Sequence, residues 1–178
     1  MGATISLGPF QYIYWGDLLD GTMFPPEIGS QWMRWGDAVR AGAHLSFHND
    51  GPVSPPIPLL NIQTAITRTT DTGHVHGANQ IISIDDALKA ETIGAAYMLH
   101  RDDEIGSLAE GKYADLVELS MDPYLADPLK LASQVKVQGT WRSGHKVDLD
   151  AFMTQIQAVE AAGTHPVDHA TAIKSHTC

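Results

Sequence analysis

The chain has 178 residues, of which 43% are hydrophobic and 18% are charged, a composition typical of a globular protein. Eleven Lys and Arg residues against 21 Asp and Glu residues give a net charge of −10, which argues against nucleic acid and anionic membrane surfaces as partners. The only cysteine is Cys178, no apolar run is long enough to span a membrane, and no signal peptide is recognisable. We therefore expect a cytoplasmic protein without an internal disulfide or a cysteine metal cluster.

The first fifty residues predict a strand, a helix and a second strand. Residues 5–15 are apolar and aromatic, and they predict a strand that is interrupted at Gly8-Pro9. After a loop, residues 31–41 predict a helix, and residues 43–48 alternate like a short strand. A strand, helix, strand order implies that the two strands are parallel.

Two more helices are predicted in the middle of the chain. Residues 59–67 predict the first, and the polar residues 69–82 predict a loop. Ser83 and Asp86 form a capping box, with Asp in place of Glu, for a longer helix that ends near Leu99.

The last third of the chain changes character. Residues 114–120 and 135–142 predict strands, and Ser143-Gly144 is a plausible hairpin turn into a third strand at 145–147. An amphipathic helix is predicted from Leu149, and residues 164–178 predict a loose tail.

A histidine and an acid stand where the strand at 43–48 ends. His48 and Asp50 share the parity of one strand face, and Gly51-Pro52 then breaks the strand. Sites in α/β proteins are commonly built at such strand ends. Asp50 could ligate a metal and accept a proton from metal-bound water. The alternatives are an ordinary turn aspartate and a buried, hydrogen-bonded His48.

Other motifs carry less weight. His74-Val75-His76 has the spacing of a metal-binding pair, but zinc needs three or four ligands, so we favour a solvated loop. We interpret His165 and His169 as surface residues. Residues 106–113 resemble a phosphate-binding loop but end in Tyr113, where a magnesium-binding hydroxyl is required, and lie between a helix and a strand in the wrong order.

Several segments together resemble the metal-dependent amidohydrolases, and within them the YtcJ-like group. The His48–Val53 segment, followed by Pro58-Leu59-Leu60 and Arg68, is similar to the last barrel strand of that family. Tyr14-Trp15-Gly16-Asp17 is similar to the strand and loop before it, and parts of residues 87–144 resemble the closing segment. The resemblance covers about residues 1–148, although the family commonly has Ser where this chain has Asn49.

The resemblance implies an α/β fold that forms the C-terminal part of a (β/α)₈ TIM barrel, with about its last two strands and their helices. It divides the chain into a barrel part at 1–104, a segment of a composite β-sandwich at 105–148, and a helix and tail at 149–178. It also implies one or two divalent metals, with zinc expected, and hydrolysis of carbon–nitrogen bonds other than peptide bonds in a small amide or cyclic amide. Asp50 is then a metal ligand and the catalytic base, while His48, Trp15 and Asp17 line the substrate site.

Much of the family pattern has no counterpart in this chain. The paired histidines of the first barrel strand and the ligands of the fourth, fifth and sixth strands are missing, and a barrel of this kind takes roughly 250 residues. We therefore expect an incomplete metal centre, weak or absent activity of the chain alone, and a partner that is either the remaining barrel portion or a second copy. The alternatives are a non-catalytic module for oligomerisation or complementation, and a metal-binding protein that uses loop and tail histidines.

Overall fold

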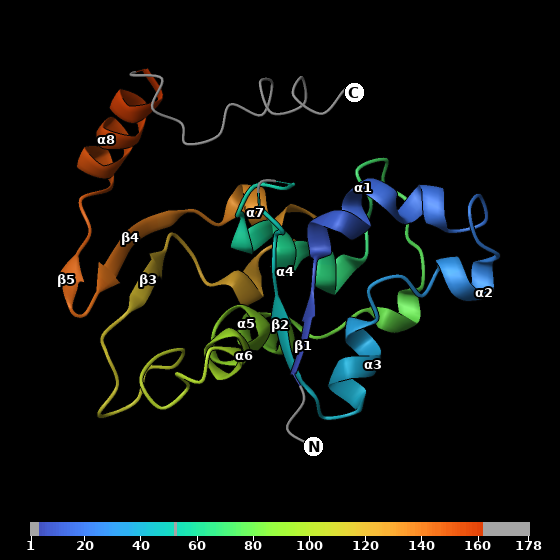
Figure 1. Ribbon diagram of the computed structural model, residues 1–178, viewed down its shortest axis with the longest axis horizontal. Coiled ribbons are helices and arrows are strands. Elements are labelled where there is room, and N and C mark those ends of the chain that lie inside the picture. The colour runs from blue at the N-terminus through green and yellow to red at the C-terminus, as the bar shows by residue number, and fades with distance from the viewer. Residues whose placement is uncertain (1–3, 52, 162–178) are drawn as a thin grey trace, which may run out of the picture.

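The computed structural model describes residues 4–51 and 53–161, which form two small sheets surrounded by helices (Figure 1). A parallel pair, β1 (Thr4–Leu7) and β2 (His44–Phe47), stands near the centre. An antiparallel sheet of β3 (Leu116–Leu119), β4 (Val137–Arg142) and β5 (His145–Lys146) lies at one end. The helices α1 (Pro9–Leu19), α2 (Pro26–Gly29) and α3 (Trp35–Arg40) lie at the other.

The parallel pairing of the first two strands is confirmed. Thr4 lies opposite His44 and Leu7 lies opposite Phe47, so the carboxyl ends of the two strands meet at one edge. On the other side of each strand, no further strand pairs with β1 or β2 among the described residues. The described residues therefore contain a two-stranded piece of parallel sheet and no closed barrel.

An aromatic core packs against this pair. The rings of Tyr12 and Trp35 meet edge to face at 5.7 Å between centroids, and Trp35 meets Phe47 in the same way at 6.3 Å. The helix α4 (Pro58–Thr67) adds Ile62 and Ala65 to this core, and all five residues are buried. Burial of each large side chain contributes about 1.5–3 kcal/mol, so α1, α3, β2 and α4 are held together chiefly by these contacts.

The predicted strand at 5–15 is wrong beyond Leu7. Residues Pro9–Leu19 form the helix α1, with Gly8 as its N-cap and Pro9 in its first turn. Proline is favoured at this position because its missing N–H has no partner in the first turn of a helix. Tyr14 and Trp15 therefore lie on a helix and not on a strand.

The predicted helix at 31–41 is shorter, because only Trp35–Arg40 are helical. The backbone carbonyls of Ser30, Trp32 and Met33 instead accept hydrogen bonds from the guanidinium of Arg68. Carbonyls that point at this side chain cannot serve a helical ladder, so the segment forms turns.

The predicted helix from Ser83 to Leu99 is two helices, α5 (Ile84–Glu91) and α6 (Ile93–Met98), which break at Thr92. The cap is confirmed, since Ser83 Oγ accepts a hydrogen bond from the Asp86 N–H at 3.1 Å. The break brings α6 against β2 so closely that a Cβ at Gly94 would lie 2.0 Å from the Leu45 carbonyl oxygen. Packing on the strand, and not local propensity, sets this boundary.

The predicted small antiparallel sheet is confirmed, with Ser143 and Gly144 at positive φ in the turn between β4 and β5. The second layer of a β-sandwich is not found among the described residues. Short 3₁₀ helices (Ala78–Gln80, Pro123–Leu125, Pro128–Lys130) and α7 (Leu131–Gln134) fill the connections. The last helix, α8 (Leu149–Ala161), begins as predicted, and the predicted tail at 164–178 lies outside the described residues.

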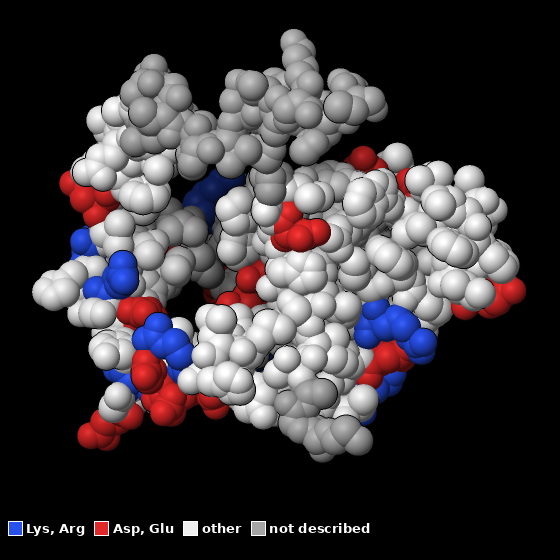
Figure 2. Space-filling view, in the orientation of Figure 1, with Lys and Arg blue, Asp and Glu red and all other residues white. Residues whose placement is uncertain are grey.

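The charges on the face shown in Figure 2 lie in small mixed groups. On the face shown in Figure 2, Lys and Arg side chains stand beside Asp and Glu side chains and form no broad basic area. Within residues 4–51 and 53–161, no helix combines the length and the apolar character needed to cross a lipid bilayer.

Candidate functional site

The edge where β1 and β2 end carries the first group of candidate residues. His48 follows β2, and its Nδ1 lies 2.9 Å from Ser6 Oγ of β1. Asp50 adopts a positive φ of 53°, is exposed, and accepts a hydrogen bond from Gln11 Nε2 at 3.0 Å. His48 and Asp50 therefore lie just beyond the carboxyl end of a buried parallel strand, as the sequence predicted.

A polar network beneath this edge fixes the chain between His48 and Asp50. The side-chain amides of Asn49 and Asn61 hydrogen-bond to each other at 3.0 and 3.2 Å, and Asn61 Nδ2 also donates to Glu91 Oε1 at 2.7 Å. Desolvation raises the pKa of Glu91, although the hydrogen bond from Asn61 partly opposes this. Asn49 thus ties the end of β2 to α4 and α5, a role that a shorter serine side chain could not fill in the same way.

The strand-end group does not by itself fit a metal ion. Among the described residues, the one set of three convergent His, Asp or Glu ligands includes neither His48 nor Asp50. A structural or catalytic zinc needs at least three protein ligands, and the described residues do not supply three at the strand end.

The second group, which we call the loop cluster, consists of Asp17, His74 and His76. One candidate ligand atom from each residue lies within 4.8 Å of the others. Asp17 Oδ1 is 2.6 Å from His76 Nε2 and 3.2 Å from His74 Nδ1. Asp17 comes from the last turns of α1, and both histidines come from the loop after α4, so residues 57 and 59 positions apart meet here.

Neighbouring side chains set the charges of the loop cluster. Desolvation opposes ionisation of Asp17, but hydrogen bonds from Thr72, His76, Thr70 and His74 together lower its pKa to about 2. Desolvation also opposes protonation of His76, whereas its contacts with Asp17 and Asp20 raise its pKa overall. His76 Nδ1 lies 2.6 Å from Asp20 Oδ2, so its ring is held between two carboxylates.

A buried arginine holds the backbone beneath the loop cluster. Arg68 is fully buried, adopts a left-handed conformation at the end of α4, and donates to the carbonyl of His76 at 2.7 Å as well as to three carbonyls of residues 30–33. Its guanidinium lies over the rings of Tyr12 and Trp35 at 4.1 and 4.5 Å. Desolvation lowers the pKa of Arg68 to about 10, and it stays charged at neutral pH.

The predicted site residues thus do not lie in one place. His48 and Asp50 stay together at the strand end, Asp17 joins the loop cluster, and Trp15 is 42% exposed on α1. The solvated-loop interpretation holds for His74, whose side chain is 70% exposed, and is wrong for His76, whose side chain is only 17% exposed. Sequence reasoning missed Asp20, which a helical assignment of residues 9–19 would have brought near Asp17.

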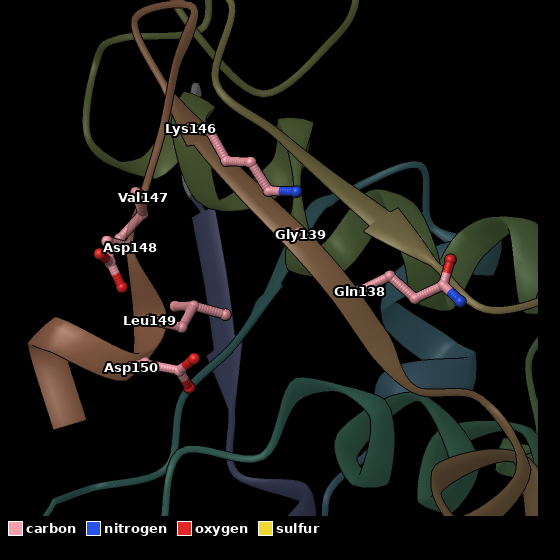
Figure 3. Close-up of a pocket in the computed structure, with 7 residues that line it drawn as sticks. All are labelled: Gln138, Gly139, Lys146, Val147, Asp148, Leu149 and Asp150. Carbon is pink, nitrogen blue, oxygen red and sulfur yellow. The ribbon is translucent and has the colours of Figure 1, made fainter.

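A third candidate region is a concave surface between β4, β5 and the start of α8. Figure 3 shows Asp148 and Asp150 at one side of it and β4 with Gln138 and Gly139 at the other. Its lining includes Lys146 but no histidine or cysteine, so it offers no set of nucleophile, base and metal ligands. We do not place the functional site there.

The fold and the strand-end residues define the class of protein. Parallel strands with ionisable side chains at their carboxyl-terminal edge are typical of α/β proteins that build their sites at that edge. Residues 2–148 match the model of the amidohydrolase family, and the chain belongs to this family.

Three known proteins illustrate the relationship. The putative amidohydrolase YtcJ of Bacillus subtilis is 31% identical over 100 residues, which are 54% of this chain and 19% of that protein. The N-substituted formamide deformylase of Arthrobacter pascens is 34% identical over 83 residues, 47% of this chain and 15% of the enzyme. An uncharacterized metal-dependent hydrolase from Pyrococcus horikoshii superposes with a TM-score of 0.54 at 25% identity, covering 82% of this chain and 27% of that one. The chain therefore spans only a minor part of each of these relatives.

Proposed function

We propose that this chain forms the C-terminal part of a metal-dependent amidohydrolase barrel that hydrolyses carbon–nitrogen bonds other than peptide bonds. The observation that carries the proposal is the position of Asp50, which follows a buried strand paired in parallel with β1 and is joined through Gln11 to the segment after β1. The relationship to a formamide deformylase supports carbon–nitrogen bond cleavage, and the relationship to a metal-dependent hydrolase supports a divalent metal, for which we propose zinc.

In this proposal, Asp50 has two roles. It supplies one carboxylate to the metal centre, and it accepts the proton of the water that attacks the amide carbon. The metal, when bound, would polarise the carbonyl of a small amide or cyclic amide. The remaining metal ligands lie outside the described residues, on another part of the barrel, and so the chain alone is expected to have little or no hydrolase activity.

The other residues that the resemblance assigns to substrate differ in their surroundings. His48 is the one that lies beside Asp50, and we propose that it contacts the substrate. Trp15 offers an exposed ring for an apolar substrate group. The carboxylate of Asp17 already contacts Thr70, Thr72, His74 and His76, so we assign it to the loop cluster instead.

The test is an assay of the chain together with the rest of its barrel. The coding DNA upstream of Met1 is expected to supply an HxH segment, in frame or as a neighbouring reading frame, and the assembled enzyme is expected to hydrolyse N-substituted amides. Removal of a general base costs about 100- to 10,000-fold in rate, so Asp50→Asn should reduce kcat by at least about 100-fold. Asp148→Asn, at the third candidate region, is the matched control. Amide turnover by the isolated 178-residue chain would contradict the proposed division of the site.

A second candidate function is a non-catalytic module that associates with itself or with another chain. The outer edges of β1 and β2 are unpaired among the described residues, and exposed strand edges favour pairing with further strands. Beside β1, Leu7 borders a groove lined by Ile28, Trp32 and Met33. Size-exclusion chromatography tests this candidate: a stable monomer in solution would rule out self-association.

A further inference from the structure

The loop cluster has the composition and the geometry of a metal site that is separate from the strand end. We infer that Asp17, His74 and His76 bind one divalent transition-metal ion, with His76 held in place by Asp20. This inference does not depend on the proposed function, because none of the four residues belongs to the group at His48 and Asp50.

The separations of the ligand atoms fit a small cation. Zinc bonds of about 2.0–2.1 Å in a tetrahedral arrangement place neighbouring ligand atoms roughly 3.4 Å apart. Asp17 Oδ1 and His74 Nδ1 are already 3.2 Å apart, and Asp17 Oδ1 and His76 Nε2 are 2.6 Å apart. An ion between them would require Asp17 Oδ1 and His76 Nε2 to move apart by roughly 0.8 Å, and the side chain of Asp17, which is 30% exposed, can make this movement.

The surrounding hydrogen bonds orient the ligands as metal sites usually do. Metal-bound histidines commonly donate their second ring N–H to a carboxylate, which fixes the ring and its tautomer. His76 has this arrangement, with Nδ1 at 2.6 Å from Asp20 Oδ2 and Nε2 directed at the other ligands. The Thr72 hydroxyl donates to Asp17 Oδ2, which leaves Asp17 Oδ1 facing the histidines.

The charge of the loop cluster also favours a cation. Asp17 and Asp20 place two carboxylate groups against the ring of His76. Asp20 Oδ1 is buried without a hydrogen-bond partner among the described residues, so no donor there reduces its negative potential. A bound cation would compensate both carboxylates at once.

The scaffold holds the ligands before a metal arrives. Arg68 and the Tyr12 hydroxyl both bind the backbone of His76, and the His74 N–H donates to Thr70 Oγ1 at 3.2 Å. A pre-ordered loop loses little conformational entropy on binding, which favours affinity.

Two imidazoles and one carboxylate select zinc, cobalt or nickel over calcium and magnesium. Three protein ligands leave a fourth coordination position for water or a small anion.

The experiment is a zinc titration of the full 178-residue chain after it has been stripped with a chelator, in competition with a chromogenic zinc indicator. We expect about one equivalent of zinc to bind tightly. Loss of an orienting carboxylate typically weakens metal binding 10- to 100-fold, so Asp20→Asn should weaken zinc binding by about that factor. His74→Ala and Asp17→Asn remove ligands and should weaken it at least as much. Because His74 is exposed, its replacement should leave the far-ultraviolet circular dichroism unchanged.

Two control variants separate this site from other possible metal ligands in the chain. His145→Ala, and a variant with His165, His169, His176 and Cys178 all replaced, should each bind zinc as the wild type does. A folded chain that binds no zinc overturns the inference. So does zinc binding that survives His74→Ala and Asp17→Asn, or that is lost only when the four residues of the tail are replaced.

Discussion

The strand end and the loop cluster differ in what each of them lacks as a metal site. The strand end has the position at which we propose the hydrolytic chemistry, but His48 and Asp50 do not converge with a third ligand among the described residues. The loop cluster has no such position, yet it brings Asp17, His74 and His76 together and orients His76 through Asp20. Position in the fold and completeness of a ligand set are therefore separate properties.

The difference follows from how each group is assembled. A site at the mouth of a barrel takes its residues from several strands, so two strands can supply only part of it. The loop cluster takes its residues from one helix end and one loop, and Tyr12 of α1 joins the two by accepting a hydrogen bond from the His76 N–H. A local site can thus be complete in a chain whose barrel site is not.

Replacing Arg68 should have the largest effect on stability. Of the two groups, it should disrupt the loop cluster. Arg68→Met removes the charged donor from four part-buried hydrogen bonds to carbonyl groups. Acceptors that lose their partner away from water cost about 1–3 kcal/mol each, so we expect a loss of about 3 kcal/mol or more in the free energy of unfolding. Urea denaturation measures it, and zinc binding should be lost in parallel. Arg142→Met, on the exposed end of β4, is the control and should leave the midpoint unchanged.

A smaller effect is expected at the strand end. Asn61 is 1% exposed and joins Asn49 to Glu91, so Asn61→Leu leaves two partly buried polar side chains without this hydrogen-bond partner. We expect a destabilisation of about 1–3 kcal/mol in urea denaturation. Zinc binding by the loop cluster should be unaffected, and this result would show that the two groups are independent of each other. The exposed Asn79→Ala should cost less than about 0.5 kcal/mol. Equal losses in the two variants would contradict the structural role of the network.

The smallest effect is a change in pH dependence at Glu91. Burial raises the pKa of Glu91 in the folded state above its ordinary value of 4.5, so folding favours the protonated form. The stabilisation of the folded state by the protonated Glu91 carboxyl is complete below the pKa of Glu91 in the unfolded chain. It is lost as the pH rises through the pKa of Glu91 in the folded chain. Glu91→Gln keeps the shape without the charge, so it should gain stability relative to the wild type as the pH rises above about 4.5. Thermal melts across this range, with exposed Glu27→Gln as control, measure it; a variant that loses stability relative to the wild type as the pH rises would show that the ionised form is favoured.

The comparison also shows which features local sequence could predict. The strand at β2, the helix α4 and the cap at Ser83 follow from alternation, length and capping chemistry within a few residues. The same local reasoning placed Asp50 at the end of a strand. Local reasoning failed at residues 9–19, where apolar side chains on several faces of the helix obscure its periodicity, and Pro9 was the available signal.

The sequence by itself determined the parallel order of the first two strands, the antiparallel sheet and the family, because these depend on short patterns and on motifs read along the chain. Tertiary structure decided three other features. Residues 31–34 are not helical because this segment binds Arg68 through its backbone carbonyls. The helix from Ser83 breaks at Thr92, and Asp17 meets His74 and His76. The physical reason is that these features depend on contacts between residues far apart in the chain. A buried guanidinium and a close helix–strand contact outweigh local propensity, and neither is visible from neighbours in sequence.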